Sequence, residues 1–158
     1  MKYKDQWRNR YVEAYNQYQD RAYPAVVKDF GYNNVTWPKV SSANGLTMFV
    51  VKFLTYAGWR ATRVSTQGRL IKGAERQASG TILVVNKFIP TSGRKGSADV
   101  SSTIKGRSVM FEIKIGSDKP SEHQLKEQAL EQQAGGFYFF IKNPEQFIEC
   151  YDLICNLA

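Results

Sequence analysis

One short stretch of the chain sets an acidic and a basic side chain where they could support hydrolysis. Phe111, Ile113 and Ile115 alternate with Glu112 and Lys114, which is the pattern of a strand with one buried face. The outward carboxylate and ammonium groups could be held together for chemistry, or they could be ordinary solvated surface. This stretch alone does not decide between the two.

The residues before this strand predict a β-hairpin that brings a second carboxylate to it. Lys105–Gly106 separates two alternating stretches, and a two-residue loop at that point places Asp99 opposite Glu112. This register separates polar from apolar side chains, whereas a slip of one residue would mix them. The apolar face would carry Val100, Ile104, Val109, Phe111, Ile113 and Ile115, and the polar face Asp99, Ser101, Thr103, Ser108, Glu112 and Lys114.

Two carboxylates facing each other on adjacent strands, with Cβ atoms about 4.5–5.5 Å apart, destabilise a hairpin unless something compensates. A divalent cation bound by Asp99 and Glu112 would compensate, and Mg²⁺ suits hard oxygen ligands at this spacing. Lys114 lies on the same face and could then orient or activate an attacking water. Alternatively, Lys114 only neutralises a surface pair. The hairpin pattern leaves both interpretations open.

The periodicity of apolar residues predicts four helices around this hairpin. Three of them have a stop signal: Pro24 after the first, Gly58 as a left-handed cap after the second, and Gly135–Gly136 after the third. An irregular stretch is expected between the first two, through Pro38. The helices should cover the aromatic stripe from Tyr3 to Tyr18, residues 44–57, residues 121–134 and residues 144–155.

Other β-branched and apolar stretches predict three more strands, over residues 59–66, 81–89 and 137–142. The Gly-rich, basic segment at residues 67–80 is expected to be a mobile loop. A strand, helix, strand unit near the end should cross over right-handed. The predicted fold class is therefore α/β, with a mixed sheet flanked by helices and a helical N-terminal extension.

Length and charge narrow the setting. The 158 residues, 42% of them hydrophobic, are enough for one sizeable core and a single domain. A net charge of +8 favours polyanions such as nucleic acid, although many basic proteins bind none. The charged first ten residues and the lack of long apolar runs predict a soluble, cytoplasmic protein without membrane contact. Cys150 and Cys155 should be reduced, packed thiols, because they would point to different sides of a helix.

The order of these residues resembles the PD-(D/E)XK nuclease superfamily, whose signature is an Asp, a spacer, then Glu, one residue and Lys. "GSAD", "FEIKIG", the helix opened by Ser121 and Gln124, and "AGGFYFFIKNPEQF" are most similar to the VRR-NUC branch, which is similar to Holliday junction resolvases. "NGLTMFVVKFLTYAGWRATRVSTQGR" is similar to the first helix and strand of phage-type members. The resemblance covers roughly residues 44–148.

This resemblance implies a restriction-endonuclease-like fold, with a nuclease domain over residues 44–158 and residues 1–43 packed on it as a helical extension. It also implies that Asp99 and Glu112 bind Mg²⁺ or Mn²⁺ with the backbone carbonyl of Ile113, and that Lys114 is catalytic. The reaction would be hydrolysis of a DNA phosphodiester. A phage-encoded protein would fit this branch.

Two departures from the family pattern matter. Ala98 stands where relatives often have Pro, which is a mild change. The helix over residues 44–57, which corresponds to the first helix of the family, lacks the Glu that many relatives use as a further metal ligand. Asn44 is the nearest polar residue at its start. We therefore favour catalysis with one metal ion.

Several other residues have a structural and a functional interpretation. Gln124 completes a capping box with Ser121, which we favour, although the family also keeps this Gln near its active site. Arg63, Arg69 and Lys72 could contact DNA phosphates or form a solvated basic surface. His123 is assigned no role, and the N-terminal aromatic stripe should serve the core or a homodimer contact, with base stacking less favoured.

Three functions remain open on the sequence. The protein could be a structure-specific endonuclease that cuts branched DNA as a dimer, or a general nuclease that degrades linear DNA. It could instead be a DNA-binding module with the same fold that does not cleave.

Overall fold

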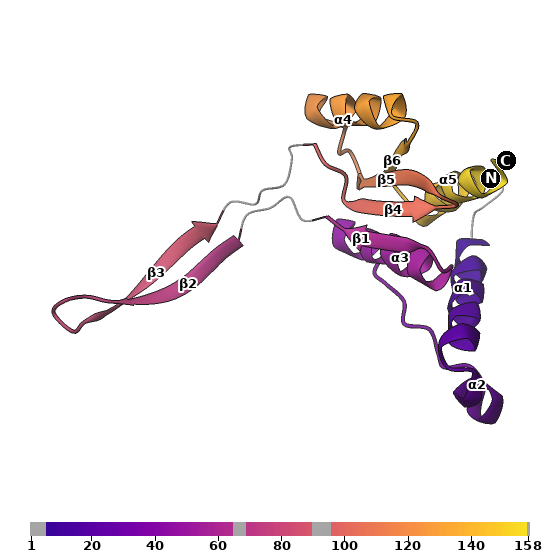
Figure 1. The fold of residues 1–158 in the computed structure, drawn as a ribbon, viewed down its shortest axis with the longest axis horizontal. Helices are drawn as coiled ribbons and strands as arrows, with labels where there is room; N and C mark the ends of the chain where they lie inside the picture. The colour runs from indigo at the N-terminus through magenta and orange to yellow at the C-terminus, as the bar shows by residue number, and fades with distance from the viewer. Residues whose placement is uncertain (1–5, 65–68, 90–95, 158) are drawn as a thin grey trace.

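The computed structural model describes residues 6–64, 69–89 and 96–157. Within these residues the chain forms five helices and six strands (Figure 1). The helices are α1 (Gln6–Ala22), α2 (Pro24–Phe30), α3 (Ala43–Tyr56), α4 (Glu122–Gln133) and α5 (Pro144–Asn156). The strands are β1 (Arg60–Arg63), β2 (Arg69–Arg76), β3 (Ile82–Ile89), β4 (Val100–Ile104), β5 (Arg107–Ile113) and β6 (Phe137–Ile141).

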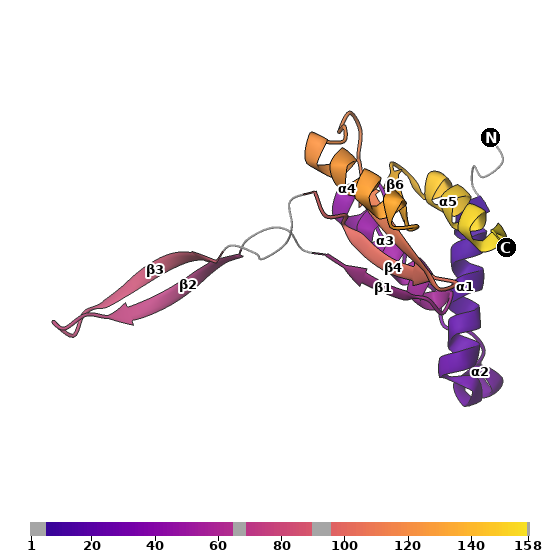
Figure 2. The ribbon, with the colours of Figure 1, turned by 45° about the horizontal axis from the view of Figure 1, so that its top comes forward.

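Four of the strands form a mixed sheet in the order β1-β4-β5-β6. The β1–β4 and β4–β5 pairs are antiparallel, and β6 runs parallel to β5 after the α4 connection. Helices flank this sheet (Figure 2). The prediction of an α/β fold with a mixed sheet and flanking helices is confirmed.

The predicted hairpin and its register are also confirmed. Lys105 and Gly106 both have positive φ angles, of 50° and 77°, as a tight two-residue turn between right-twisted strands requires. The turn pairs Val100 with Phe111, and both side chains are fully buried. Ser102 falls on the same buried face, where its hydroxyl donates to the Val109 carbonyl at 2.7 Å and so remains satisfied.

The hydrophobic core lies between this sheet and helices α1, α3 and α5. Phe49 on α3 is at the centre of an aromatic cluster and contacts Trp7, Tyr11, Phe53 and Phe147. Trp7 and Tyr11 are buried, which confirms the core interpretation for that part of the N-terminal stripe. Tyr3, at its start, lies outside the described residues.

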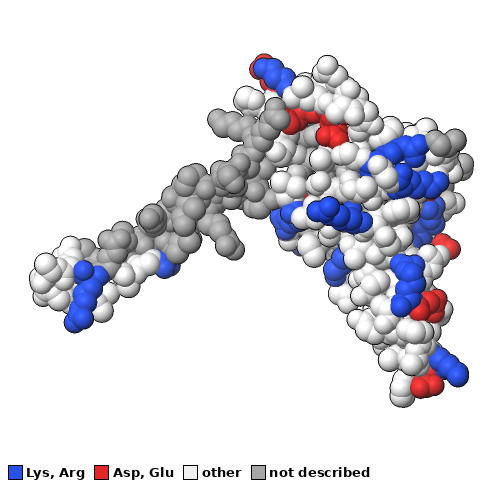
Figure 3. Space-filling view, in the orientation of Figure 1, with Lys and Arg blue, Asp and Glu red and all other residues white. Residues whose placement is uncertain are grey.

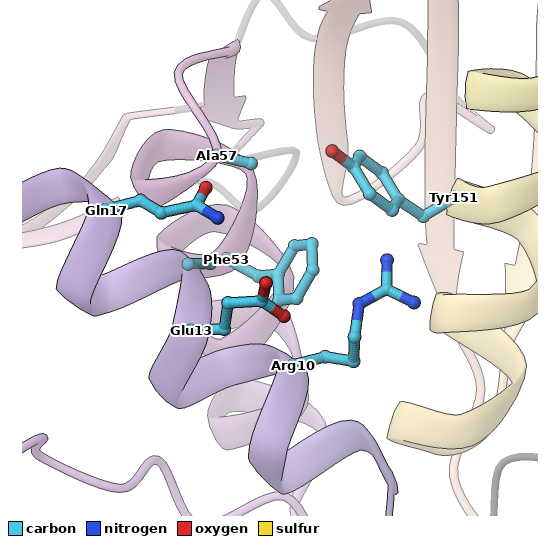
Figure 4. A pocket seen from close by; sticks show the side chains of 7 residues that line it. Arg10, Glu13, Gln17, Phe53, Ala57 and Tyr151 are labelled. Carbon is cyan, nitrogen blue, oxygen red and sulfur yellow. The ribbon is translucent and has the colours of Figure 1, made fainter.

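An ion pair also attaches the N-terminal helix α1 to α5. Arg10 on α1 donates two hydrogen bonds to the Asp152 carboxylate of α5, at 3.0 and 2.7 Å. Figure 4 shows Arg10 reaching toward α5 beside a cavity of about 130 Å³ that Phe53 and Tyr151 line. Helix α1 therefore belongs to the same packed unit as α3 and α5.

Two segments differ from the predictions. The irregular stretch expected after Pro24 begins with the short helix α2, because proline fits the first turn of a helix as well as it ends the previous one. The loop expected over residues 67–80 contains strand β2, which pairs with β3 along its whole length. Gly73 and Ala74 weaken the strand pattern of β2, so its pairing partner decides its conformation.

The β2–β3 hairpin forms a sheet of its own. It extends away from the four-stranded sheet (Figures 1 and 2). The predicted strand at 59–66 is shorter than expected, since β1 covers Arg60–Arg63 and residues 65–66 lie outside the described residues. Among the described helices, none is long and apolar enough to cross a membrane.

The remaining predicted elements match the structure. Gly58 has a φ of 89° after α3, α5 closes the chain, and Cys150 and Cys155 are half-buried free thiols. Burial raises the pKa of Cys150 to about 11, which keeps this thiol protonated at neutral pH.

The aromatic cluster gives a stability prediction. Phe49→Ala should reduce the free energy of unfolding by about 3–5 kcal/mol, because truncating a buried Phe removes its contacts and leaves a cavity. Urea unfolding followed by circular dichroism measures this change. The matched control is Phe30→Ala, whose side chain is 85% exposed and should shift stability by less than about 0.5 kcal/mol. Equal losses in both variants would contradict the central role of Phe49.

Candidate active site

The structure brings the two predicted carboxylates together at one end of the four-stranded sheet. Asp99 directly precedes β4, and Glu112 lies near the end of β5. The backbone N–H of Asp99 donates to Glu112 Oε2 at 3.2 Å, and the N–H of Ile113 donates to Asp99 Oδ2 at 2.9 Å. These two hydrogen bonds join Asp99 to the end of β5, one residue beyond the last β4–β5 pair, and fix both carboxylates.

Glu112 and Lys114 are not solvated surface charges, because each residue is only 6% exposed. The Lys114 Nζ atom lies 3.4 Å from Glu112 Oε1 and 3.3 Å from Asp118 Oδ2. The Lys114 backbone N–H donates to the Ile141 carbonyl on β6. A buried ion pair of this kind gains little net stability over apolar side chains, so stability alone does not account for it.

The burial of Glu112 changes its protonation. Desolvation and, second, the nearby charge of Asp99 raise the pKa of Glu112 to about 7, although Lys114 acts in the opposite direction. A carboxyl group with this pKa is only partly ionised at neutral pH. A bound cation would favour its ionised form and so reverse the shift.

Gln124 has both of the roles considered for it. Its side-chain oxygen accepts the backbone N–H of Ser121 at 2.9 Å, and the Ser121 hydroxyl accepts the Gln124 N–H at 3.3 Å. This is the predicted capping box at the start of α4. The Gln124 side-chain amide also donates to Glu112 Oε1. Capping therefore holds Gln124 in position to contact the site.

Asp118 and Tyr138 belong to the site but were not singled out from the sequence. Asp118 is four residues after Lys114, a spacing that could have indicated the ion pair. Tyr138 on β6 lies next to Met110 in the sheet, and its hydroxyl donates to the Gly96 carbonyl at 3.1 Å. Burial and then the charges of Glu112 and Asp99 raise the pKa of Tyr138, so it stays a neutral donor.

A pocket of about 200 Å³ adjoins this arrangement. Tyr138 lines it together with Ala98 and the α4 residues Glu127 and Glu131. Gly96 at its edge has a φ of 87°, and a Cβ there would approach the His123 carbonyl oxygen to 2.6 Å. Only glycine allows the chain before Asp99 to pass this close to α4. His123 thus contributes its backbone to the packing of this edge.

The predicted nucleic-acid contacts lie in two places. Arg63 ends β1 beside Val100 and donates to Asn44 Oδ1 at the start of α3, so it lies near the carboxylates. Lys72 is exposed on β2, in the separate hairpin. Arg69 begins β2, and its side chain lies outside the described residues. Of the two whose side chains the structure describes, Arg63 lies at the candidate site and Lys72 does not.

The donor set suits a hard divalent cation. Asp99 and Glu112 present carboxylate oxygens from neighbouring strands, and Asp99 Oδ2 and Glu112 Oε2, with one described hydrogen bond each, can accept a further contact. Mg²⁺ and Mn²⁺ prefer such ligands. Among the described residues, no group of three or more Asp, Glu, His or Cys side chains is arranged so that it could hold a metal ion. The two carboxylates, with the Ile113 carbonyl on the same strand, would leave further positions for water and substrate.

No protein-family model matches the chain, and no curated protein matches it significantly. The resemblance to VRR-NUC nucleases therefore stays a prediction.

The paired carboxylates predict how stability depends on pH and metal. The pKa of Glu112 is raised on folding from 4.5 to about 7, so its stabilising effect is complete below pH 4.5 and is lost as pH rises through 7. In a chelator at pH 8, Asp99→Asn should relieve the repulsion and raise stability by about 0.2–1 kcal/mol. The difference should disappear near pH 5, where Glu112 is protonated.

Thermal melts across this pH range, with and without Mg²⁺, measure both effects. Mg²⁺ should raise the Tm of the wild type more than that of Asp99→Asn, because only the wild type keeps both ligands. Equal gains from Mg²⁺ would show that Asp99 is not a ligand. A lower metal-free Tm for Asp99→Asn at pH 8 would show that the carboxylates do not repel each other.

Proposed function

We propose that the protein is a metal-dependent DNA endonuclease of the PD-(D/E)XK type. One observation carries this proposal: Asp99 and Glu112 are held on adjacent strands next to the buried ammonium group of Lys114. The positive net charge of the chain supports a polyanionic substrate. The mixed sheet with flanking helices supports the restriction-endonuclease-like fold that the resemblance implies.

The chemistry of the residues fits phosphodiester hydrolysis. A bound Mg²⁺ or Mn²⁺ would neutralise charge at the scissile phosphate and make a water more acidic. Asp99 and Glu112 would hold the cation, with the Ile113 carbonyl as a further ligand. Lys114 would orient the attacking water and stabilise the negative charge that develops on the phosphate. Gln124 would keep the Glu112 carboxylate in position through its amide hydrogen bond.

The second candidate function is a DNA-binding module that does not cleave. The contacts of Lys114 favour it, because this ammonium group offsets part of the negative charge of Glu112 and Asp118 without a metal ion. One gel separates the two functions, with linear and branched DNA incubated in Mg²⁺, Mn²⁺, Ca²⁺ or EDTA. Cleavage in Mg²⁺ or Mn²⁺ supports the nuclease, and preference for branched DNA supports a structure-specific enzyme. Binding without cleavage in any lane supports the module.

The proposed roles predict the effect of isosteric substitutions. Asp99→Asn, Glu112→Gln and Lys114→Met should each slow cleavage by about a hundredfold or more, since loss of one preorganised electrostatic group costs this much. DNA binding, measured by fluorescence anisotropy in EDTA, should persist because scattered phosphate contacts supply most affinity. The control Glu122→Gln changes an exposed carboxylate in the first turn of α4 and should cleave at the wild-type rate. Wild-type cleavage by Asp99→Asn would refute the assignment.

Gln124 allows its two roles to be separated. Gln124→Glu keeps a residue that completes the capping box, but it places a carboxylate against Glu112 Oε1. We expect slower cleavage than in the wild type, with the helical circular dichroism signal unchanged. Initial rates at saturating Mg²⁺ measure this effect. A variant that cleaves at the wild-type rate would show that Gln124 serves only to cap α4.

A further inference from the structure

The β2–β3 hairpin carries features that the candidate site does not explain. It forms a two-stranded sheet that pairs with no other described strand. A two-stranded hairpin alone is only marginally stable in water. This hairpin also exposes apolar side chains, with Ile82 at 65% and Val84 at 73%. Such a ribbon is expected to be stabilised by a binding partner that covers these side chains.

The insertion that carries the hairpin begins and ends at the candidate site. The chain leaves the four-stranded sheet after β1 and returns at Asp99, and the Val64 N–H donates to the Asp99 carbonyl at 2.8 Å. Arg63 pairs with Val100 directly beside this point. The hairpin therefore projects from the same end of the sheet that holds the two carboxylates (Figure 1).

The register places two cations on one face of the ribbon. Arg76 pairs with Ile82, and Ala74 with Val84, so these four residues and Lys72 share a face. Lys72 and Arg76 are both exposed. Figure 3 shows Lys and Arg side chains, and no acidic ones, on the described surface of the hairpin in that view. This face combines positive charge with branched aliphatic groups.

The charge of the chain is concentrated in this region. Residues 65–95 contain six Lys or Arg residues and one acidic residue, which gives +5 of the total +8. Two copies of the hairpin would repel each other, whereas a polyanion would be attracted. A two-stranded ribbon also fits the major groove of B-form DNA, where aliphatic side chains can contact thymine methyl groups.

We propose that the β2–β3 hairpin is an arm that binds duplex DNA beside the candidate site, with Lys72 and Arg76 contacting phosphates. At about 3.3 Å per residue, its eight-residue strands reach about 25 Å along the DNA. The arm supplies affinity, and the carboxylates where this insertion joins the sheet supply chemistry. The proposal rests on the proposed function only in naming DNA as the partner.

The test measures binding of a labelled 30-base-pair duplex in EDTA, where no metal-dependent cleavage occurs, from 50 to 200 mM salt. Lys72→Ala/Arg76→Ala should reduce the slope of log affinity against log salt by about 1.8, or 0.9 per phosphate contact, and lower affinity by about tenfold or more. The control Arg8→Ala/Lys28→Ala removes the same charge from exposed positions on α1 and α2 and should keep the wild-type slope. Thermal melts verify that each variant is folded.

Three results would refute the proposal that the arm binds DNA. Unchanged affinity in Lys72→Ala/Arg76→Ala, or an equal change in the control, would show that the hairpin has no special role in binding. Dissociation of a dimer by Ile82→Thr/Val84→Thr in sedimentation velocity, with DNA affinity unchanged, would show that the arm binds a second copy. Lack of cleavage in Mg²⁺ with arm-dependent binding would refute the nuclease but keep the arm. Cleavage together with DNA binding that does not depend on the arm would support the nuclease and refute the role of the arm.

Discussion

The pairing of β4 with β5 is the interaction on which the candidate site depends. The turn at Lys105–Gly106 sets the register, and the buried face made by Val100 and Phe111 holds it against a one-residue slip. Such a slip would turn Glu112 into the core and move it away from Asp99. The same apolar packing that stabilises the sheet therefore determines where the two carboxylates meet.

Burial then sets the protonation and the charge balance of these groups. Glu112 is shielded from water, so its raised pKa reflects a cost that Lys114 offsets only in part. Because Asp118 also contacts Lys114, this ammonium group has carboxylate partners on two sides. Asp99, Glu112 and Asp118 bring three carboxylates to the site against the one buried ammonium group of Lys114, with Arg63 nearby, in a chain that is positive overall. A hard cation would restore the local balance, which is why the same contacts that destabilise the metal-free site make it suitable for metal.

The strands, helices and hairpin register that carry Asp99, Glu112 and Lys114 could be predicted because each depends on local pattern. Alternation of apolar residues, a two-residue turn and a capping box are all encoded within a few positions. The contact between Gln124 and Glu112 depends instead on how α4 packs on β6, and Lys114 is also tied to β6 by a backbone hydrogen bond. Strand β2 was missed for a related reason, since its weak pattern acquires meaning only from pairing with β3.

The hairpin keeps its described basic side chains apart from the acidic residues of the four-stranded sheet. Lys114 is the described basic side chain that contacts Glu112, whereas the exposed Lys72 and Arg76 of the hairpin lie on the separate β2–β3 sheet. Inserting them between β1 and β4 keeps them close in the chain but away from the carboxylates. The ladder from Arg63 to Val100, continued by the Val64 to Asp99 hydrogen bond, closes the base of this insertion. The sheet can thus hold its acidic residues in fixed geometry while the opposite charge extends outward on a separate ribbon.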